Sequence, residues 1–226
     1  FMHSAGARGD TLLIELRSDL ESGGRRYAAG SLLAADAPAY LKGVRSFQLL
    51  FEPGPTRSLA GFTSTREHLL LTVLDQVAGR IEEWHRGADG RFTRRAVAAP
   101  SPGTLGVVSL ADPLRRQDPL AGQYLLSYTD FLTLDTLYLG QAGSDRREAL
   151  KALPASFDAG GMRAEQFFAT SRDGTRVPYF VVWPRGAQAD GRNPTLLYGY
   201  GGFRVSMDPW YSRGMGAAWY ARGGVL

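Results

Sequence analysis

The chain has 226 residues, of which 44% are hydrophobic and 21% charged, proportions typical of an ordinary globular protein. It has no cysteine, which excludes a disulfide framework, a thiolate nucleophile and a cysteine-based zinc site. The formal net charge is only +4 and the arginines are scattered, which argues against a nucleic-acid-binding face, and no apolar run is long enough to cross a membrane.

Short strands separated by turns make up the first part of the sequence. We expect a tight turn at Gly23-Gly24 and a helical turn over residues 36–42. The predicted strands here lie at residues 11–16, 31–35, 46–51, 68–75, 79–85 and 91–97.

A weak internal repeat then follows, with Asp130 in the place that Asp75 occupies in the preceding unit. Its predicted strands lie at residues 123–130, 135–139 and 147–151. Antiparallel strands that recur roughly every 40–50 residues are typical of propeller blades, and a β-sandwich with regular strand spacing is the alternative. We interpret the two aspartates as caps of turns.

The repeat of short antiparallel strands ends after residue 151. A hairpin is predicted from strands at 166–170 and 177–183, because Asp173-Gly174 between them suits a tight turn. A helix is expected over 211–222 and should end at Gly223-Gly224. The sequence therefore indicates two parts, a propeller-like one followed by an α/β layer.

The most informative segment is Pro194–Phe203, with the sequence PTLLYGYGGF. It is typical of a short buried strand, with Tyr198 inside it, that runs into a glycine-rich turn. Three glycines in that turn can take positive φ and let a ligand approach the backbone. These glycines are Gly199, Gly201 and Gly202.

Three motifs in order resemble the opening of the catalytic domain of the prolyl oligopeptidase family of serine peptidases: Asp173–Pro178, Pro194–Phe203 and Gly223–Leu226. A looser similarity extends upstream through residues 49–53 and 129–132. Enzymes of that family combine a seven-bladed propeller with an α/β-hydrolase domain that carries a Ser–Asp–His triad. The resemblance implies a mainly β fold, with the C-terminal blades of a propeller over residues 1–155 and the first strands of an α/β-hydrolase domain over 156–226.

The same resemblance implies roles for two side chains of the glycine-rich loop. Tyr200 would donate a hydrogen bond in the oxyanion hole, a role that suits a phenol that is neutral at pH 7. Phe203 would line the pocket for a proline ring. The related oligopeptidase that cleaves after basic residues has serine and tyrosine at the positions of Gly202 and Phe203, so the proline-specific branch is favoured.

The sequence departs from the family in lacking a Gly-x-Ser-x-Gly elbow, and Ser171 and Ser206 do not supply one. We therefore expect a fragment of a proline-specific endopeptidase that is inactive alone because the triad is absent. Its expected partners are short proline-containing peptides, with no metal or other cofactor, no nucleic acid and no membrane. The parent is expected to be a monomer in the cytoplasm, with the periplasm left open. The alternative is a non-catalytic propeller that binds a peptide or protein.

The remaining polar residues receive structural interpretations. His3, His68 and His85 are too scattered for a metal site and are interpreted as surface or hydrogen-bonded residues. Glu82-Glu83 and Arg94-Arg95 are interpreted as solvated strand faces.

Overall fold

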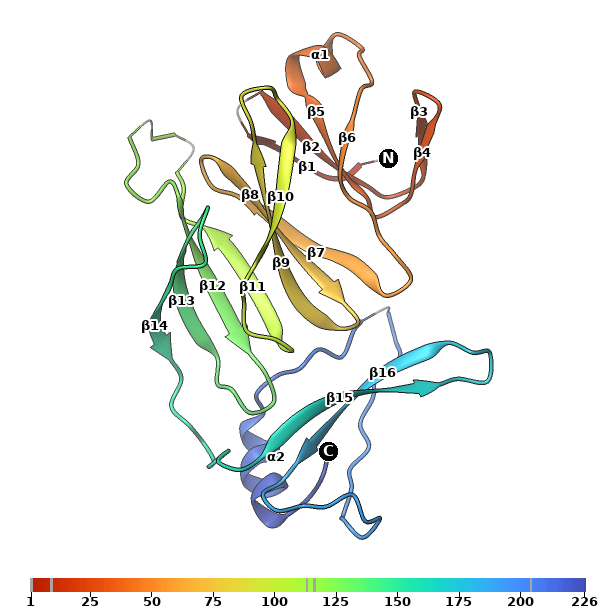
Figure 1. Ribbon diagram of the computed structural model, residues 1–226, viewed down its shortest axis with the longest axis vertical. Helices are drawn as coiled ribbons and strands as arrows, with labels where there is room; N and C mark the ends of the chain where they lie inside the picture. The colour runs from red at the N-terminus through yellow and green to blue at the C-terminus, as the bar shows by residue number, and fades with distance from the viewer. Residues whose placement is uncertain (1, 9, 113, 116, 204) are drawn as a thin grey trace.

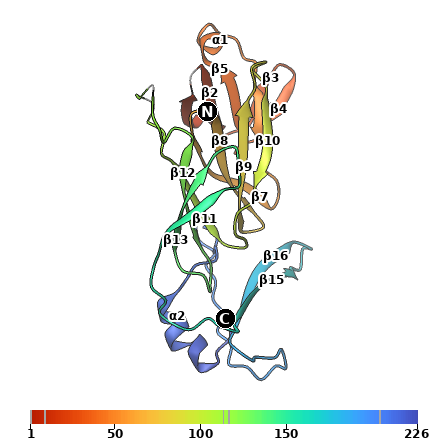
Figure 2. The ribbon, with the colours of Figure 1, turned by 60° about the vertical axis from the view of Figure 1, so that its left-hand side comes forward.

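The computed structural model describes residues 2–8, 10–112, 114, 115, 117–203 and 205–226. Within these ranges the chain forms three four-stranded antiparallel sheets that stand side by side, followed by a smaller second part below them (Figure 1). The view in Figure 2 shows the same separation between the two parts. None of the helices in the described ranges is both long and apolar enough to span a membrane.

Each of the three sheets is built from strands that follow one another along the chain. Sheet 1 contains β1 (Met2–Arg8), β2 (Thr11–Leu16), β5 (Leu32–Asp36) and β6 (Gln48–Phe51), with the side hairpin β3 (Leu20–Ser22) and β4 (Arg25–Tyr27) and the short helix α1 (Ala37–Leu41) in its connections. Sheet 2 contains β7 (Arg57–Ser64), β8 (His68–Asp75), β9 (Ala78–Arg86) and β10 (Phe92–Val97). Sheet 3 contains β11 (Thr104–Ser109), β12 (Gln123–Thr129), β13 (Thr136–Gln141) and β14 (Arg147–Ala152).

Strand β8 packs against both neighbouring sheets. Successive side chains of a strand point to opposite faces. Leu69 and Leu71 therefore pack into a core shared with sheet 1, whereas Leu70 packs into a second core shared with sheet 3. All three leucines are fully buried. The uninterrupted apolar run is thus the signature of a central strand covered on both faces.

The predicted blade-like arrangement is confirmed, but the repeat begins one strand earlier than expected. Asp75 and Asp130 follow the second strand of their sheets, not the first, because β7 and β11 were missed. Strand β7 has no fully buried residue and mixes polar with apolar side chains, and β11 is interrupted by Gly106, so both lack a strong apolar signal. Asp130 caps its turn as expected, because its Oδ1 accepts hydrogen bonds from the Leu132 and Thr133 amides at 2.7 and 2.6 Å. No such side-chain bond is found for Asp75 among the described contacts.

The tight turn between β8 and β9 contains an unfavourable backbone conformation. Asp75 and Ala78 pair across it, and the two residues between them, Gln76 and Val77, have φ of 53° and 66°. Two-residue hairpins with positive φ at both positions favour Asn-Gly, and a β-branched residue is strained there. This turn is also close to the second part of the molecule, because the Gln166 side chain donates a hydrogen bond to the Gln76 carbonyl at 2.6 Å.

Replacing Val77 by glycine is therefore expected to raise the free energy of unfolding by about 1 kcal/mol, since it removes the left-handed strain. Urea unfolding monitored by tryptophan fluorescence measures the difference. The matched control is Val108→Gly on β11, which lies in an exposed part of a regular strand and should lower stability. An unchanged or lower midpoint for Val77→Gly would contradict the expected strain.

The second part begins with the predicted hairpin, which is confirmed. Strands β15 (Arg163–Thr170) and β16 (Arg176–Trp183) pair over their whole length, and Gly174 has φ of +84° in the turn. Strand β16 is hydrogen-bonded through Val182 to Leu226, and Val225 forms a parallel bridge with Thr195. Residues 225 and 226 thus lie between β16 and the start of the Pro194–Phe203 segment.

The predicted helix over 211–222 is shorter and divided. Helix α2 (Arg213–Ala218) is capped by the Ser212 side chain, and the 3₁₀ turn η1 (Tyr220–Arg222) follows it. The expected stop is confirmed, because Gly223 takes the left-handed conformation with φ of 81°. The predicted boundary between residues 155 and 156 falls in the connection from β14 to β15 and stays a prediction.

Candidate functional site

The Tyr-Gly loop, residues 194–211, connects the short parallel bridge to α2 and passes beneath the lower ends of sheets 2 and 3 (Figure 1). Its first residues are fixed, since the Leu196 amide donates to the Val225 carbonyl and the Val225 amide to the Pro194 carbonyl, both at 2.9 Å. The prediction of a buried strand is wrong, because the segment is exposed from its first residue on. Leu196 is 41% exposed, Leu197 95% and Tyr198 64%. A buried parallel strand needs neighbours on both sides, and the described residues provide one bridge on one side.

The two predicted site residues both lie in the exposed middle of this loop. Tyr200 is 49% exposed and Phe203 93% exposed, so the described residues do not enclose a shared pocket around them. The Tyr200 ring folds back over Gly202, where an added Cβ would lie 2.8 Å from the tyrosine hydroxyl. The absence of a side chain at Gly202 therefore leaves room for the Tyr200 ring. The roles of Tyr200 and Phe203 in the oxyanion hole and the proline pocket stay predictions.

The glycines of the loop do not take the conformation that was expected of them. Gly199, Gly201 and Gly202 are not among the residues with positive φ, whereas Phe203 is, with φ of 55°. The expectation that glycines carry the left-handed positions is therefore wrong. The space around Gly199 and Gly201 is open, so their small size leaves the backbone accessible from outside.

The far end of the loop is anchored on sheet 3. The Thr104 hydroxyl on β11 donates a hydrogen bond to the Pro209 carbonyl at 2.6 Å, and the Tyr211 amide donates to the Thr129 hydroxyl on β12 at 3.3 Å. The two threonines are direct partners in the register of β11 and β12. Sequence reasoning missed both, since no local pattern indicates a contact between residues 104 and 209.

Tyr211 also joins the loop to the connection between β14 and β15. Its ring stacks on Phe157 at a centroid distance of 4.8 Å, and its hydroxyl accepts a hydrogen bond from the Ser156 amide at 3.2 Å. Phe157 in turn lies against α2 at Gly216, where an added Cβ would be 1.8 Å from the ring. The end of the loop is thus held between sheet 3, this connection and α2.

Asp208 stands immediately before this anchor. One of its carboxylate oxygens is buried and has no hydrogen-bond partner among the described residues. Burial raises the pKa of this carboxyl group. Asp208 is the one charged side chain in the described part of the loop.

A second polar feature, which we call the inter-sheet ion cluster, consists of Glu83, Arg95, Asp145 and the Gly143 amide. The Glu83 carboxylate is 2% exposed and accepts hydrogen bonds from Arg95 at 2.7 Å and from the Gly143 amide at 2.9 Å. Arg95 also pairs with Asp145 at 2.9 Å. The cluster joins sheet 2 to sheet 3 by directional contacts.

The interpretation of Glu82-Glu83 and Arg94-Arg95 as solvated faces is therefore wrong for the two buried glutamates and the half-buried Arg95, and it is confirmed for Arg94, whose side chain is 51% exposed. Glu82 is also buried and pairs with Arg94 and with Arg57. Strand β9 lies inside sheet 2 and is covered by neighbouring sheets, so neither of its faces is open. The bond to Glu83 is the main cause that raises the pKa of Arg95, and the bond from Arg95 is the main cause that lowers the pKa of Asp145.

Two histidines that are distant in sequence meet beside this cluster. His68 and His85 are paired across β8 and β9, with ring centroids 5.0 Å apart. His68 Nε2 lies 4.0 Å from a Glu83 oxygen, and His85 Nδ1 lies 3.1 Å from the Glu67 carbonyl. They are thus closer than the sequence indicated, but no group of three metal-ligating side chains is found among the described residues. The side chain of His3 lies outside the described part.

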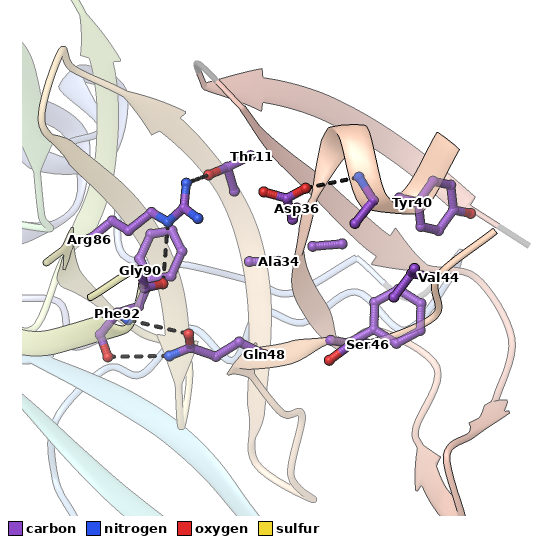
Figure 3. A pocket seen from close by; sticks show the side chains of 13 residues that line it. Thr11, Ala34, Asp36, Tyr40, Val44, Ser46, Gln48, Arg86, Gly90 and Phe92 are labelled. Atoms are coloured by element: carbon purple, nitrogen blue, oxygen red, sulfur yellow. Dashed lines mark hydrogen bonds between the residues drawn. The ribbon is translucent and has the colours of Figure 1, made fainter. Parts of the chain in front are cut away.

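A cavity of about 240 Å³ opens between sheets 1 and 2 next to α1 (Figure 3). The charged side chains that line it make hydrogen bonds within the fold. Asp36 caps α1 through the Ala39 amide at 2.9 Å, and Arg86 donates to the Thr11 hydroxyl at 3.0 Å. Gln48 bonds both main-chain groups of Phe92 across the two sheets. The cavity lies near α1, at the opposite end of the sheets from the Tyr-Gly loop (Figure 1).

Comparison with known proteins gives consistent results for both parts of the chain. An uncharacterized peptidase of Sinorhizobium fredii is 36% identical over 213 residues, which is 93% of this chain and 28% of that protein. A prolyl endopeptidase of Elizabethkingia meningoseptica is 34% identical over 99 residues, 44% of this chain and 14% of that protein. The structure of a post-proline cleaving enzyme from Rickettsia typhi superposes with a TM-score of 0.78 at 27% identity over 98% of this chain and 31% of that one.

No family model matches the sequence. The chain spans less than a third of the length of these curated relatives. The superposed structure covers the three sheets and the second part together, so the sequence-based fold class, a partial propeller followed by the start of an α/β-hydrolase domain, is confirmed.

Proposed function

Because this chain belongs to the prolyl oligopeptidase family, we propose that it forms part of a serine peptidase that cleaves short peptides after proline. The chain would supply late blades of the propeller over residues 1–155 and the start of the catalytic domain over 156–226. The observation that supports this most strongly is the loop with Tyr200 and Phe203, which is anchored at both ends beside the blades.

The proposed reaction is acyl transfer through a covalent acyl-enzyme. A serine hydroxyl, which gives its proton to a base, attacks the carbonyl carbon of the proline and forms a tetrahedral intermediate whose oxygen carries a negative charge. Collapse of this intermediate breaks the C–N bond to the next residue, whose amine leaves with that proton. The Tyr200 hydroxyl would donate a hydrogen bond to that oxygen, which stabilises the charge more in the transition state than in the bound substrate. Phe203 would pack its ring against the proline ring and thereby select the residue before the cleaved bond.

No Gly-x-Ser-x-Gly elbow occurs within these 226 residues to supply the serine nucleophile. We therefore propose that this chain by itself does not turn over substrate, and that activity requires a protein of the full length of its relatives. Two of those relatives carry names that refer to prolyl cleavage, in line with this proposal. The cellular location, the monomeric state and the lack of a cofactor stay predictions.

Chromogenic dipeptide substrates test the proposal directly. A protein that carries this chain at the full length of its relatives is expected to hydrolyse a Gly-Pro anilide about a hundredfold more efficiently, in kcat/KM, than the matching Gly-Arg anilide. The 226-residue chain alone should hydrolyse neither. A preference for Gly-Arg would instead assign the protein to cleavage after basic residues, and no cleavage of either by the full-length protein would favour a peptide-binding propeller.

A further inference from the structure

We propose that Thr104 and Thr129 form a clamp through which sheet 3 positions the Tyr-Gly loop for catalysis. The kinetic test of this inference rests on the proposed peptidase function. The clamp itself is inferred from the contacts of the described residues.

The two threonines contact the two ends of a three-residue segment. Thr104 donates to the Pro209 carbonyl, and Thr129 accepts from the Tyr211 amide. Because the threonines are direct partners across β11 and β12, they form one rigid unit at the lower end of sheet 3. Pro209 is fully buried and Tyr211 nearly so, although Trp210 between them is half exposed. The segment therefore rests on the sheet through its main chain.

The clamp can influence the position of Tyr200 because few hydrogen bonds hold the middle of the loop. Among the described residues 197–203 and 205–208, the one main-chain hydrogen bond of the loop is internal, from the Val205 amide to the Gly202 carbonyl. The bonds that join the loop to other elements lie at residues 194–196 and 209–211. Loss of the Thr104 bond would leave this end held by the Thr129 bond and by the stacking of Tyr211 on Phe157, so it would loosen the end of the loop without releasing it.

Other contacts between the two parts of the molecule do not involve the clamp. Phe131 after β12 packs on Phe180 of β16 at a centroid distance of 5.4 Å, and Gln166 bonds the Gln76 carbonyl. Loss of the Thr104 hydroxyl should therefore loosen the loop without separating the two parts. Valine has the same branched shape as threonine and keeps the β-strand preference at position 104.

The test uses Thr104→Val in a protein of the full length of the relatives, with the Gly-Pro anilide as substrate. We expect kcat to fall about tenfold with KM changed less than about twofold, because misplacement of a catalytic group lowers the rate of the chemical step. Thr104→Ser retains the hydroxyl and should restore most of kcat. The matched control is Thr136→Val on β13 of the same sheet, whose hydroxyl bonds only the nearby Leu134 carbonyl among the described contacts, and it should leave kcat unchanged.

Hydrogen exchange gives a second readout that does not depend on activity. The Val205 and Tyr211 amides, which donate hydrogen bonds in the wild type, should exchange several-fold faster in Thr104→Val than in the wild type or in Thr136→Val, whereas amides of β12 and β13 should be unaffected. Unchanged exchange in the loop would overturn the clamp, as would a rise in KM at constant kcat. If the wild type hydrolyses no proline substrate, the proposed function fails, and the exchange experiment alone then decides on the clamp.

Discussion

Replacement of Tyr200 by phenylalanine is expected to lower kcat for a Gly-Pro anilide by about 10²–10³-fold, with little change in KM. Removing one hydrogen-bond donor from an oxyanion hole costs about 2.7–4 kcal/mol of transition-state stabilisation. Phenylalanine keeps the ring that lies over Gly202, so only the hydroxyl is lost. Steady-state kinetics on a protein of the full length of the relatives measures the effect.

The matched control is Tyr198→Phe, which removes a hydroxyl from an exposed tyrosine two residues earlier in the same loop. That variant should retain wild-type kcat. Equal losses in both variants would indicate a general disturbance of the loop, and no loss in Tyr200→Phe would refute the oxyanion role. A rise in KM at constant kcat would place the hydroxyl in ground-state binding instead.

Replacement of Glu83 by alanine is expected to lower the free energy of unfolding by about 3–5 kcal/mol, which is the usual cost of removing one partner of a buried ion pair. Without this carboxylate, the Gly143 amide loses its acceptor and Arg95 keeps only the more exposed Asp145 and the Ser144 carbonyl as described partners. Urea unfolding followed by circular dichroism measures the loss.

Glu148→Ala on the exposed strand β14 provides the control for removing a carboxylate, and it should change stability by less than about 0.5 kcal/mol. Glu83→Gln keeps the size of the side chain and removes only the charge, so its loss should lie between those of the other two variants. Equal stability of Glu83→Ala and Glu148→Ala would show that the inter-sheet ion cluster contributes nothing to folding.

The sequence predicted those elements whose signal is local. Asp173-Gly174 between two apolar runs is sufficient to predict the hairpin of β15 and β16, and Gly223 marks the end of the helical segment because it takes positive φ. The strands with dense apolar residues, such as β2 and β8, were also placed correctly. In each case the residues that determine the structure are neighbours in the chain.

Features that depend on distant residues were missed or misread. Glu83 is charged and follows Glu82, so a single strand viewed alone indicates solvent exposure; only the sheet packed against β9 buries it and provides the Gly143 amide. The sequence around Thr104 does not indicate its contact with Pro209. The motif that identified the Tyr-Gly loop likewise did not predict the backbone conformation of the loop, since Phe203 has positive φ and the three glycines of the motif do not.

The inter-sheet ion cluster has a consequence for recombination between relatives. Glu83 and Arg95 belong to sheet 2, whereas Gly143 and Asp145 follow β13 in sheet 3. A chimera with a crossover between residues 97 and 142 would inherit the two halves of this cluster from different parents. Exchanges of single blades that separate sheets 2 and 3 should therefore yield stable protein only when both parents carry compatible charges at these positions.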